Sequence, residues 1–105
     1  MEYRFLGNSG LKVSVLSFGG WITQSGQAVE DTSLECIKAA FDGGINFFDT
    51  AEAYSAGESE KIMGKAFKKF GWARSDLVVS TKLYWGGKGI NSTGNETTVY
   101  PLLNH

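Results

Sequence analysis

Three residues of the kinds that move protons follow successive apolar runs of the sequence. Asp49 comes after the run Ile45–Phe48, Tyr54 lies in the segment beyond it, and Lys82 comes after the run Leu77–Thr81. Hydride reduction of a carbonyl leaves an alkoxide, so a proton donor is needed as charge develops on the oxygen. A phenol with an ordinary pKa of about 10 is a reluctant donor at neutral pH. A nearby ammonium stabilises a phenolate and a carboxylate keeps the ammonium charged, so the three types together suit carbonyl chemistry.

Each of the three residues also has a purely structural interpretation. Asp49 with Thr50 could cap the turn after its strand, Tyr54 could be an aromatic of a loop, and Lys82 could be a solvated strand end. In parallel α/β sheets, functional side chains gather at the carboxyl ends of the strands. A shared position at that edge favours the functional interpretation, but spacing alone leaves both interpretations open.

The elements that must position these residues alternate along the chain. The sequence predicts a hairpin at 3–6 and 11–14, a strand at 15–20, a helix at 30–42, a strand at 45–48, a helix from the Ser55-to-Glu58 capping box to Gly71, and a strand at 77–81. Strands that alternate with single helices indicate right-handed crossovers and a parallel sheet. We therefore expect Gly20, Asp49 and Lys82 at one edge of that sheet.

Composition argues against several other classes of function. The 105 residues carry a formal net charge of −1 without a polybasic cluster, so no nucleic-acid partner is expected. No Cys/His cluster is present that could hold a metal, and no G-x-G-x-x-G follows a predicted strand. Cys36 is the single cysteine, the N-terminus lacks a signal-peptide core, and the longest apolar stretch is far below the ~20 residues of a membrane span. The expected location is the cytoplasm.

One segment of the chain resembles a family signature. Residues 44–54, Gly-Ile-Asn-Phe-Phe-Asp-Thr-Ala-Glu-Ala-Tyr, look like the G-I-N-x-F-D-T-A-x-x-Y motif of the aldo-keto reductase superfamily, and Ser80-Thr81-Lys82 resembles its third-strand lysine motif. Within the superfamily, the chain is most similar to the potassium-channel beta-subunit branch. That likeness is carried by Gly20-Trp21 with Gln27, by residues 54–60 and by residues 85–89, and the resemblance as a whole extends from residue 1 to about residue 92.

The resemblance implies a fold, a reaction and partners. The fold would be part of a (β/α)8 TIM barrel, an α/β architecture represented here by the hairpin, three strands and two helices. The reaction would be the NADPH-dependent reduction of aldehydes or ketones, with NADP(H) as cofactor and a small carbonyl compound as substrate. The alternative is a regulatory fragment of a channel beta subunit that senses NADP(H), with a channel alpha subunit or further copies of itself as partners.

The resemblance also assigns roles residue by residue. Tyr54 would be the proton donor, Lys82 the ammonium that makes it a better acid, and Asp49 both the partner of Lys82 and a neighbour of the nicotinamide ribose. The cofactor would be lined by Gly20, Trp21, Gln27 and Asp49, and the substrate pocket by Trp21, Tyr54 and Trp85. Position 20 is often threonine in relatives, so its glycine is expected to remove one hydroxyl contact.

The sequence departs from a whole barrel in its length. Such a barrel takes roughly 250 residues and eight strands, whereas three barrel strands are predicted here. We expect residues 1–89 to be the N-terminal portion of a reductase domain and residues 90–105 to be an unrelated, disordered tail. The position after strand four and the phosphate-binding segments of the family have no counterpart. A truncated and inactive chain is the expectation.

Overall fold

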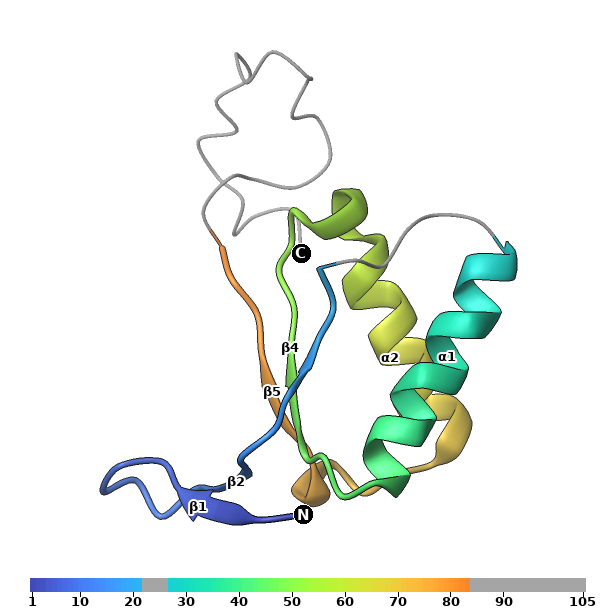
Figure 1. Cartoon of the computed structure of the whole chain (residues 1–105). Coiled ribbons are helices and arrows are strands. Elements are labelled where there is room, and N and C mark those ends of the chain that lie inside the picture. Colours follow the sequence, from blue (N-terminus) through green and yellow to red (C-terminus); the bar gives the residue numbers. More distant parts are fainter. Residues whose placement is uncertain (22–26, 84–105) are drawn as a thin grey trace.

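The computed structural model of the chain describes residues 1–21 and 27–83, with side chains for residues 1–21 and 29–83. The chain opens with an antiparallel hairpin of β1 (Tyr3–Phe5) and β2 (Lys12–Ser14), in which Arg4 pairs with Val13. The hairpin therefore forms where the sequence predicts it, although each strand is shorter. In Figure 1 the hairpin lies below the larger sheet, at the end where the strands of that sheet begin.

The larger sheet consists of three parallel strands. They are β3 (Phe18–Gly19), β4 (Phe47–Asp49) and β5 (Val78–Ser80), and β4 lies in the middle of the order β3-β4-β5. The predicted parallel sheet is confirmed. Among the described residues β3 and β5 each pair with β4 alone, so the sheet is open at both edges.

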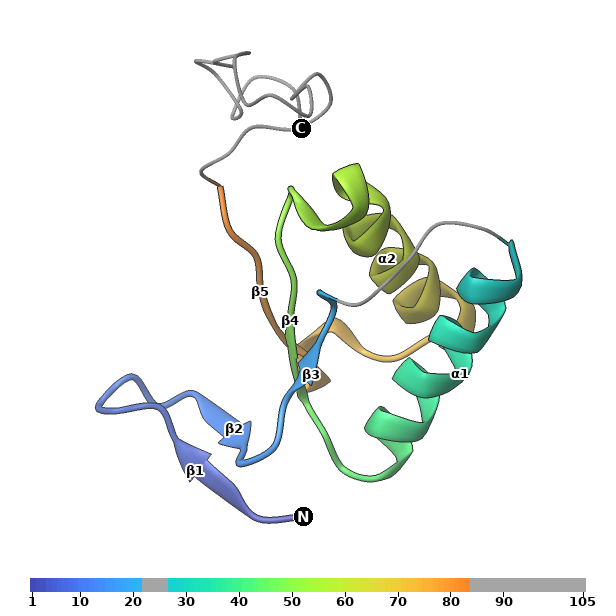
Figure 2. The same ribbon diagram turned by 45° about the horizontal axis from the view of Figure 1, so that its top comes forward.

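Two helices cover one face of this sheet, as Figures 1 and 2 show. They are α1 (Gln27–Asp42), which begins three residues before the predicted start, and α2 (Glu58–Phe70). Two short 3-10 turns, η1 (Tyr54–Gly57) and η2 (Arg74–Asp76), complete the described elements. α2 ends where the sequence predicts, because Gly71 adopts a left-handed φ of 65° that glycine tolerates without a Cβ clash. No helix in the described ranges is long and apolar enough to cross a membrane.

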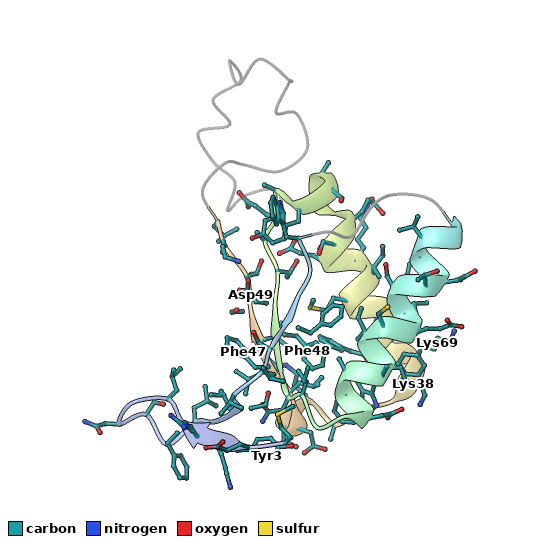
Figure 3. The ribbon with its side chains drawn as sticks, viewed as in Figure 1. Tyr3, Lys38, Phe47, Phe48, Asp49 and Lys69 are labelled. Carbon is teal, nitrogen blue, oxygen red and sulfur yellow. The ribbon has the colours of Figure 1, made fainter. Side chains whose placement is uncertain are left out.

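The core lies between the sheet and the helices and centres on Phe48, which is fully buried. Phe18 of β3 and Val79 of β5 flank Phe48 in the strand register and pack against the same core. Because successive side chains of a strand point to opposite faces, Phe47 and Asp49 lie on the face that the helices leave open. Figure 3 shows Phe48 directed towards the helices. Alternation along β4 thus separates a core residue from a candidate catalytic one.

The hairpin is fixed to the amino-terminal end of the sheet by polar contacts. Asn46 accepts the Ser14 N–H at 2.8 Å and donates from Nδ2 to the Lys12 carbonyl at 3.0 Å. Tyr3 Oη donates to the Gly44 carbonyl at 2.6 Å. These contacts anchor the hairpin away from the carboxyl edge, where the candidate site lies.

The start of α2 differs from the prediction. The assignment of Ser55 as the N-cap of a capping box is wrong, because Gly57 occupies the N-cap of α2, with a φ of 91°. Ser55 and Ala56 instead adopt left-handed conformations, with φ of 50° and 53°. A sharp left-handed turn therefore takes the place of the predicted cap.

Candidate active site

The strand register brings the carboxyl ends of three strands to one edge. Gly19 pairs with Asp49, and Asp49 with Ser80. The hydrogen bonding continues past the strand ends: the Gly20 N–H donates to the Asp49 carbonyl at 2.8 Å, and the Glu52 N–H to the Lys82 carbonyl at 3.2 Å. The segments that carry the predicted site residues are therefore held together by backbone contacts, and the expected placement of Gly20, Asp49 and Lys82 at one edge is confirmed.

Asp49 is held at both carboxylate oxygens. Lys82 Nζ lies 2.6 Å from Oδ2, and Ser80 Oγ donates to Oδ1 at 2.5 Å. Burial by itself would raise the pKa of Asp49, but the hydrogen bonds from Lys82 and Ser80 and the charge of Lys82 outweigh it, so the pKa lies below its usual value. Conversely, the hydrogen bond to Asp49 raises the pKa of Lys82 against the smaller opposing effect of burial. The pair is therefore ionised across neutral pH.

Lys82 also reaches Tyr54. Besides Asp49, its Nζ donates to the Thr50 carbonyl at 2.9 Å and to Tyr54 Oη at 3.4 Å. An ammonium has three donors and no acceptor, so Tyr54 Oη must accept in this contact. The phenol proton is then free to be donated elsewhere, for example to a carbonyl oxygen. The 3.4 Å separation is long, as is common for catalytic contacts before a substrate is bound.

Tyr54 is placed by an unusual local backbone. Its N–H donates to the Ala51 carbonyl at 3.1 Å, which closes the turn that follows β4. Ser55 and Ala56 then reverse the chain in the left-handed region. A left-handed conformation costs a residue with a Cβ roughly 1–2 kcal/mol, and strain of this kind concentrates at functional sites. The turn directs the chain into α2 immediately after the phenol.

The remaining predicted residues are only partly described. Gly20 is buried at the edge, and next to it Trp21 is 74% exposed. The side chain of Gln27 and the whole of Trp85 lie outside the described residues, as does the predicted tail 90–105. The glycine at position 20 leaves no gap for a missing hydroxyl, because Ser59 Oγ stands where a Cβ of residue 20 would project. A hydroxyl is thus present beside position 20, supplied by α2.

Sequence reasoning missed three hydroxyl residues around the site: Ser80, Thr50 and Ser59. The position of Ser80 beside Asp49 could have been predicted, because Ser80 lies two positions before Lys82 and opposite Asp49 in a parallel pair. Thr50 and Ser59 hydrogen-bond to each other at 2.8 Å from separate elements. No periodicity in the sequence indicates that contact.

Two hollows of the described surface lie away from the candidate site. Of about 630 Å³ each, they are lined by the hairpin and by the amino-terminal ends of the strands, one beside Tyr3 and Asn46 and the other beside Phe5 and Phe47. Neither hollow includes Tyr54 or Lys82. Both of these hollows are at the opposite end of the sheet, so the candidate site is identified here by its side-chain geometry. Within the described ranges no cluster of three His, Cys, Asp or Glu residues could hold a metal.

Comparison of the sequence with known proteins points to one family. The profile of the aldo/keto reductase family matches residues 15–100. A probable voltage-gated potassium channel subunit beta from Arabidopsis thaliana is 50% identical over 94 residues, which cover 90% of this chain and 29% of that protein. A protein of the same name from Oryza sativa subsp. japonica is 51% identical over 94 residues, again 90% of this chain and 29% of the relative.

Solved structures point the same way. The holo form of an aldo-keto reductase from Bacillus halodurans superposes with a TM-score of 0.69 at 35% identity, covering 79% of this chain and 26% of that one. An aldo-keto reductase from Klebsiella pneumoniae in complex with NADPH superposes with a TM-score of 0.62 at 27% identity, covering 70% of this chain and 25% of that one. The chain spans less than a third of these relatives, and its open sheet corresponds to part of their TIM barrel. The chain belongs to the aldo/keto reductase family.

Proposed function

We propose that this chain carries the proton-donating part of an NADPH-dependent carbonyl reductase site, with Tyr54 as the acid, Lys82 as its activating cation and Asp49 as the anchor of Lys82. The observation that supports the proposal is the position of Lys82 Nζ, within bonding distance of Asp49 Oδ2, the Thr50 carbonyl and Tyr54 Oη at once. Membership of the aldo/keto reductase family gives this geometry its reaction class.

The chemistry divides between cofactor and protein. When bound, NADPH would supply the hydride for the carbonyl carbon of an aldehyde or ketone. Tyr54 donates its proton to the carbonyl oxygen as negative charge develops there, and Lys82 stabilises the phenolate that remains. Asp49 keeps Lys82 charged and aimed, because a carboxylate at 2.6 Å favours the ammonium over the neutral amine. Ser80 fixes the plane of that carboxylate through its second oxygen.

We propose that the described residues line one end of the cofactor. The exposed indole of Trp21 and the open lone pairs of the Asp49 carboxylate suit a flat ring and a ribose hydroxyl, and we propose that Gly20 and Gln27 complete this wall. Trp85 is proposed to shape the substrate pocket with Trp21 and Tyr54. Lys82 is already engaged by Asp49, so the cofactor phosphates would be held by other cations. The exposed thiol of Cys36 suits a reducing compartment, which favours the cytoplasm.

A chimera tests the proposal directly. Residues 1–89 would replace the matching segment of the Bacillus halodurans reductase, which supplies the rest of a barrel. NADPH-dependent reduction of 4-nitrobenzaldehyde by this chimera, and its loss on Tyr54→Phe, is the expected result. An inactive chimera that still folds and binds NADPH would contradict the proposal, because it would show that these residues do not form a competent acid.

A regulatory function is the second candidate, and the names of the plant relatives favour it. In that case the site would bind NADP(H) as part of a channel-associated or self-associating subunit, and turnover would be secondary. Tyr54→Phe separates reduction from regulation. The substitution would remove the acid and abolish reduction, but it would leave channel association and NADP(H) binding intact. Co-purification of the chimera with a potassium-channel alpha subunit is the measurement that favours the regulatory function.

A further inference from the structure

Two buried hydroxyl groups join three elements beside the candidate site. Thr50 follows β4 and Ser59 lies in the first turn of α2, and both side chains are buried, with 3% and 1% exposed. Thr50 Oγ1 and Ser59 Oγ are 2.8 Å apart, and Ser59 Oγ donates to the Gly20 carbonyl at 3.0 Å. A hydroxyl has one proton, so Ser59, which donates to Gly20, must accept from Thr50. The hydrogen bonds therefore run in one direction, from Thr50 through Ser59 to Gly20.

Gly20 is held on both sides of its Cα. Its N–H donates to the Asp49 carbonyl at 2.8 Å, while its carbonyl accepts from Ser59. A Cβ at this position would approach Ser59 Oγ more closely than any van der Waals contact allows, and would lie 3.2 Å from Thr50 Oγ1. The Ser59 hydroxyl that fixes the Gly20 carbonyl is therefore also the group that excludes a side chain at position 20.

We propose that Ser59 and Thr50 are positioning residues, which fix the carboxyl end of β3 against α2 and so set Trp21 relative to Asp49. On the same geometry, Ser59 restricts position 20 to glycine. We call the hydrogen bonds from Thr50 through Ser59 to Gly20 the clamp. The link from the clamp to cofactor binding rests on the proposed function, because it assumes that Trp21 lines the cofactor site. The clamp itself rests on the buried contacts alone.

Amide hydrogen exchange on the 105-residue chain tests the clamp without reference to activity. Thr50→Val keeps the shape of the side chain and removes its hydroxyl, whereas Thr50→Ser keeps the hydroxyl. Exchange of the Gly20 and Trp21 amides should become about tenfold faster in Thr50→Val and Ser59→Ala, because a buried acceptor is left without its donor. Thr50→Ser and the remote, exposed control Ser75→Ala should leave it unchanged. Equal exchange in all variants would overturn the clamp.

A double substitution tests the restriction on position 20. Gly20→Ala alone should speed exchange throughout β3, because the new methyl group meets Ser59 Oγ. Gly20→Ala combined with Ser59→Ala removes that oxygen and should restore part of the protection, so the two effects should not add. Additive effects would overturn the steric part of the inference.

The chimera separates the clamp from the proposed function. In it, Ser59→Ala should raise the KM for NADPH about tenfold with little change in kcat, and Thr50→Ser should behave as the parent does. Faster exchange with an unchanged KM would overturn the positioning role. If the chimera shows no reduction at all, the proposed function fails, while the exchange measurements on the chain still decide the clamp.

Discussion

Ser80 lies directly opposite Asp49 in the register of β5 and β4, and its hydroxyl holds the Asp49 oxygen that Lys82 leaves free, at 2.5 Å. The relationship follows from parallel pairing, because residues in register at the carboxyl ends of neighbouring strands share one face. Asp49 is therefore restrained by the Ser80 hydroxyl and the Lys82 ammonium, both from β5 and the residues that follow it. Titration of Asp49 therefore reports on these two contacts.

Acidification should weaken the candidate site through Asp49. The pKa of Asp49 in the folded chain lies below the ordinary value of 3.8, because the hydrogen bonds from Lys82 and Ser80 and the Lys82 charge outweigh the opposing effect of burial. Its contribution to stability is therefore present above 3.8 and is lost as the pH falls through the lowered folded value. The thermal midpoint of the chimera minus that of its Asp49→Asn variant should shrink on acidification. A difference that is independent of pH would contradict the assignment.

At alkaline pH the stability should depend on pH with the opposite sign, through Lys82. The pKa of Lys82 is raised above 10.5, mainly by its hydrogen bond to Asp49, so its contribution is present below 10.5 and is lost as the pH rises through the raised value. The same comparison between the chimera and its Asp49→Asn variant, extended to alkaline pH, should show a second loss.

Tyr54→Phe in the chimera should lower carbonyl reduction by about two orders of magnitude or more, because general acid catalysis is typically worth 10²–10⁴-fold. NADPH binding should survive, since the substitution deletes one hydroxyl group and leaves the predicted cofactor contacts in place. Tyr3→Phe is the matched control, as Tyr3 donates to the Gly44 carbonyl at the opposite end of the sheet. Full activity in Tyr54→Phe would show that another group is the acid.

Lys82→Met should be comparably harmful to reduction, because the phenolate that forms would lose its neighbouring cation. Lys38→Met provides a control of matched exposure: Lys38 pairs with Asp42 on α1, and both lysine side chains are 51% exposed. Figure 3 labels Lys38 on that helix, away from Asp49. Steady-state rates should fall in the first variant and not in the second; equal rates would remove Lys82 from the mechanism.

Because of the left-handed turn after Tyr54, we expect a glycine at position 56 to stabilise the protein. Ala56 has a φ of 53°, so Ala56→Gly should raise the stability of the chimera by about 1 kcal/mol. Ala53 has a right-handed φ of −79°, so Ala53→Gly should lower it by roughly 0.5–1 kcal/mol. Urea unfolding of both variants measures the difference, and a loss of stability in Ala56→Gly would show that the turn is not strained as described.

The 105-residue chain by itself should neither bind NADPH tightly nor turn over. Its described sheet is open at both β3 and β5, and unpaired strand edges favour association between chains. The cofactor contacts proposed above concern the nicotinamide end alone, and Lys82 is already engaged by Asp49. Titration with NADPH, followed by tryptophan fluorescence, checks this expectation alongside an assay with 4-nitrobenzaldehyde. Saturable micromolar binding would falsify it.

Much of the fold could be predicted because local patterns and tertiary demands agree. In α1, Leu34 and Ile37 recur at helical spacing, and both are buried. Gly71 predicts the end of α2 and adopts the left-handed conformation that the position requires. The convergence of Asp49 and Lys82 follows from topology alone, because parallel strands carry their carboxyl ends to one edge.

The turn between β4 and α2 could not be predicted in the same way. The Ser55-to-Glu58 spacing indicates a capping box, but Ser55 and Ala56 are forced into left-handed conformations that their side chains disfavour. Only tertiary constraints can hold such residues there, and these are absent from a local pattern. The contact of Ser59 with Thr50 and Gly20 is equally non-local, since Gly20 is 39 positions from Ser59.

The open face of the sheet has a consequence for the dielectric around the acid. Asp49 and Lys82 are 35% and 51% exposed, so water and salt screen their attraction. Any layer of protein packed over Phe47 and Asp49 would exclude that solvent, and the attraction between opposite charges grows as the surrounding dielectric constant falls. The strength of the Asp49–Lys82 attraction is therefore set partly from outside these strands. Ionic strength should perturb the pair strongly while the face is open and weakly once it is covered.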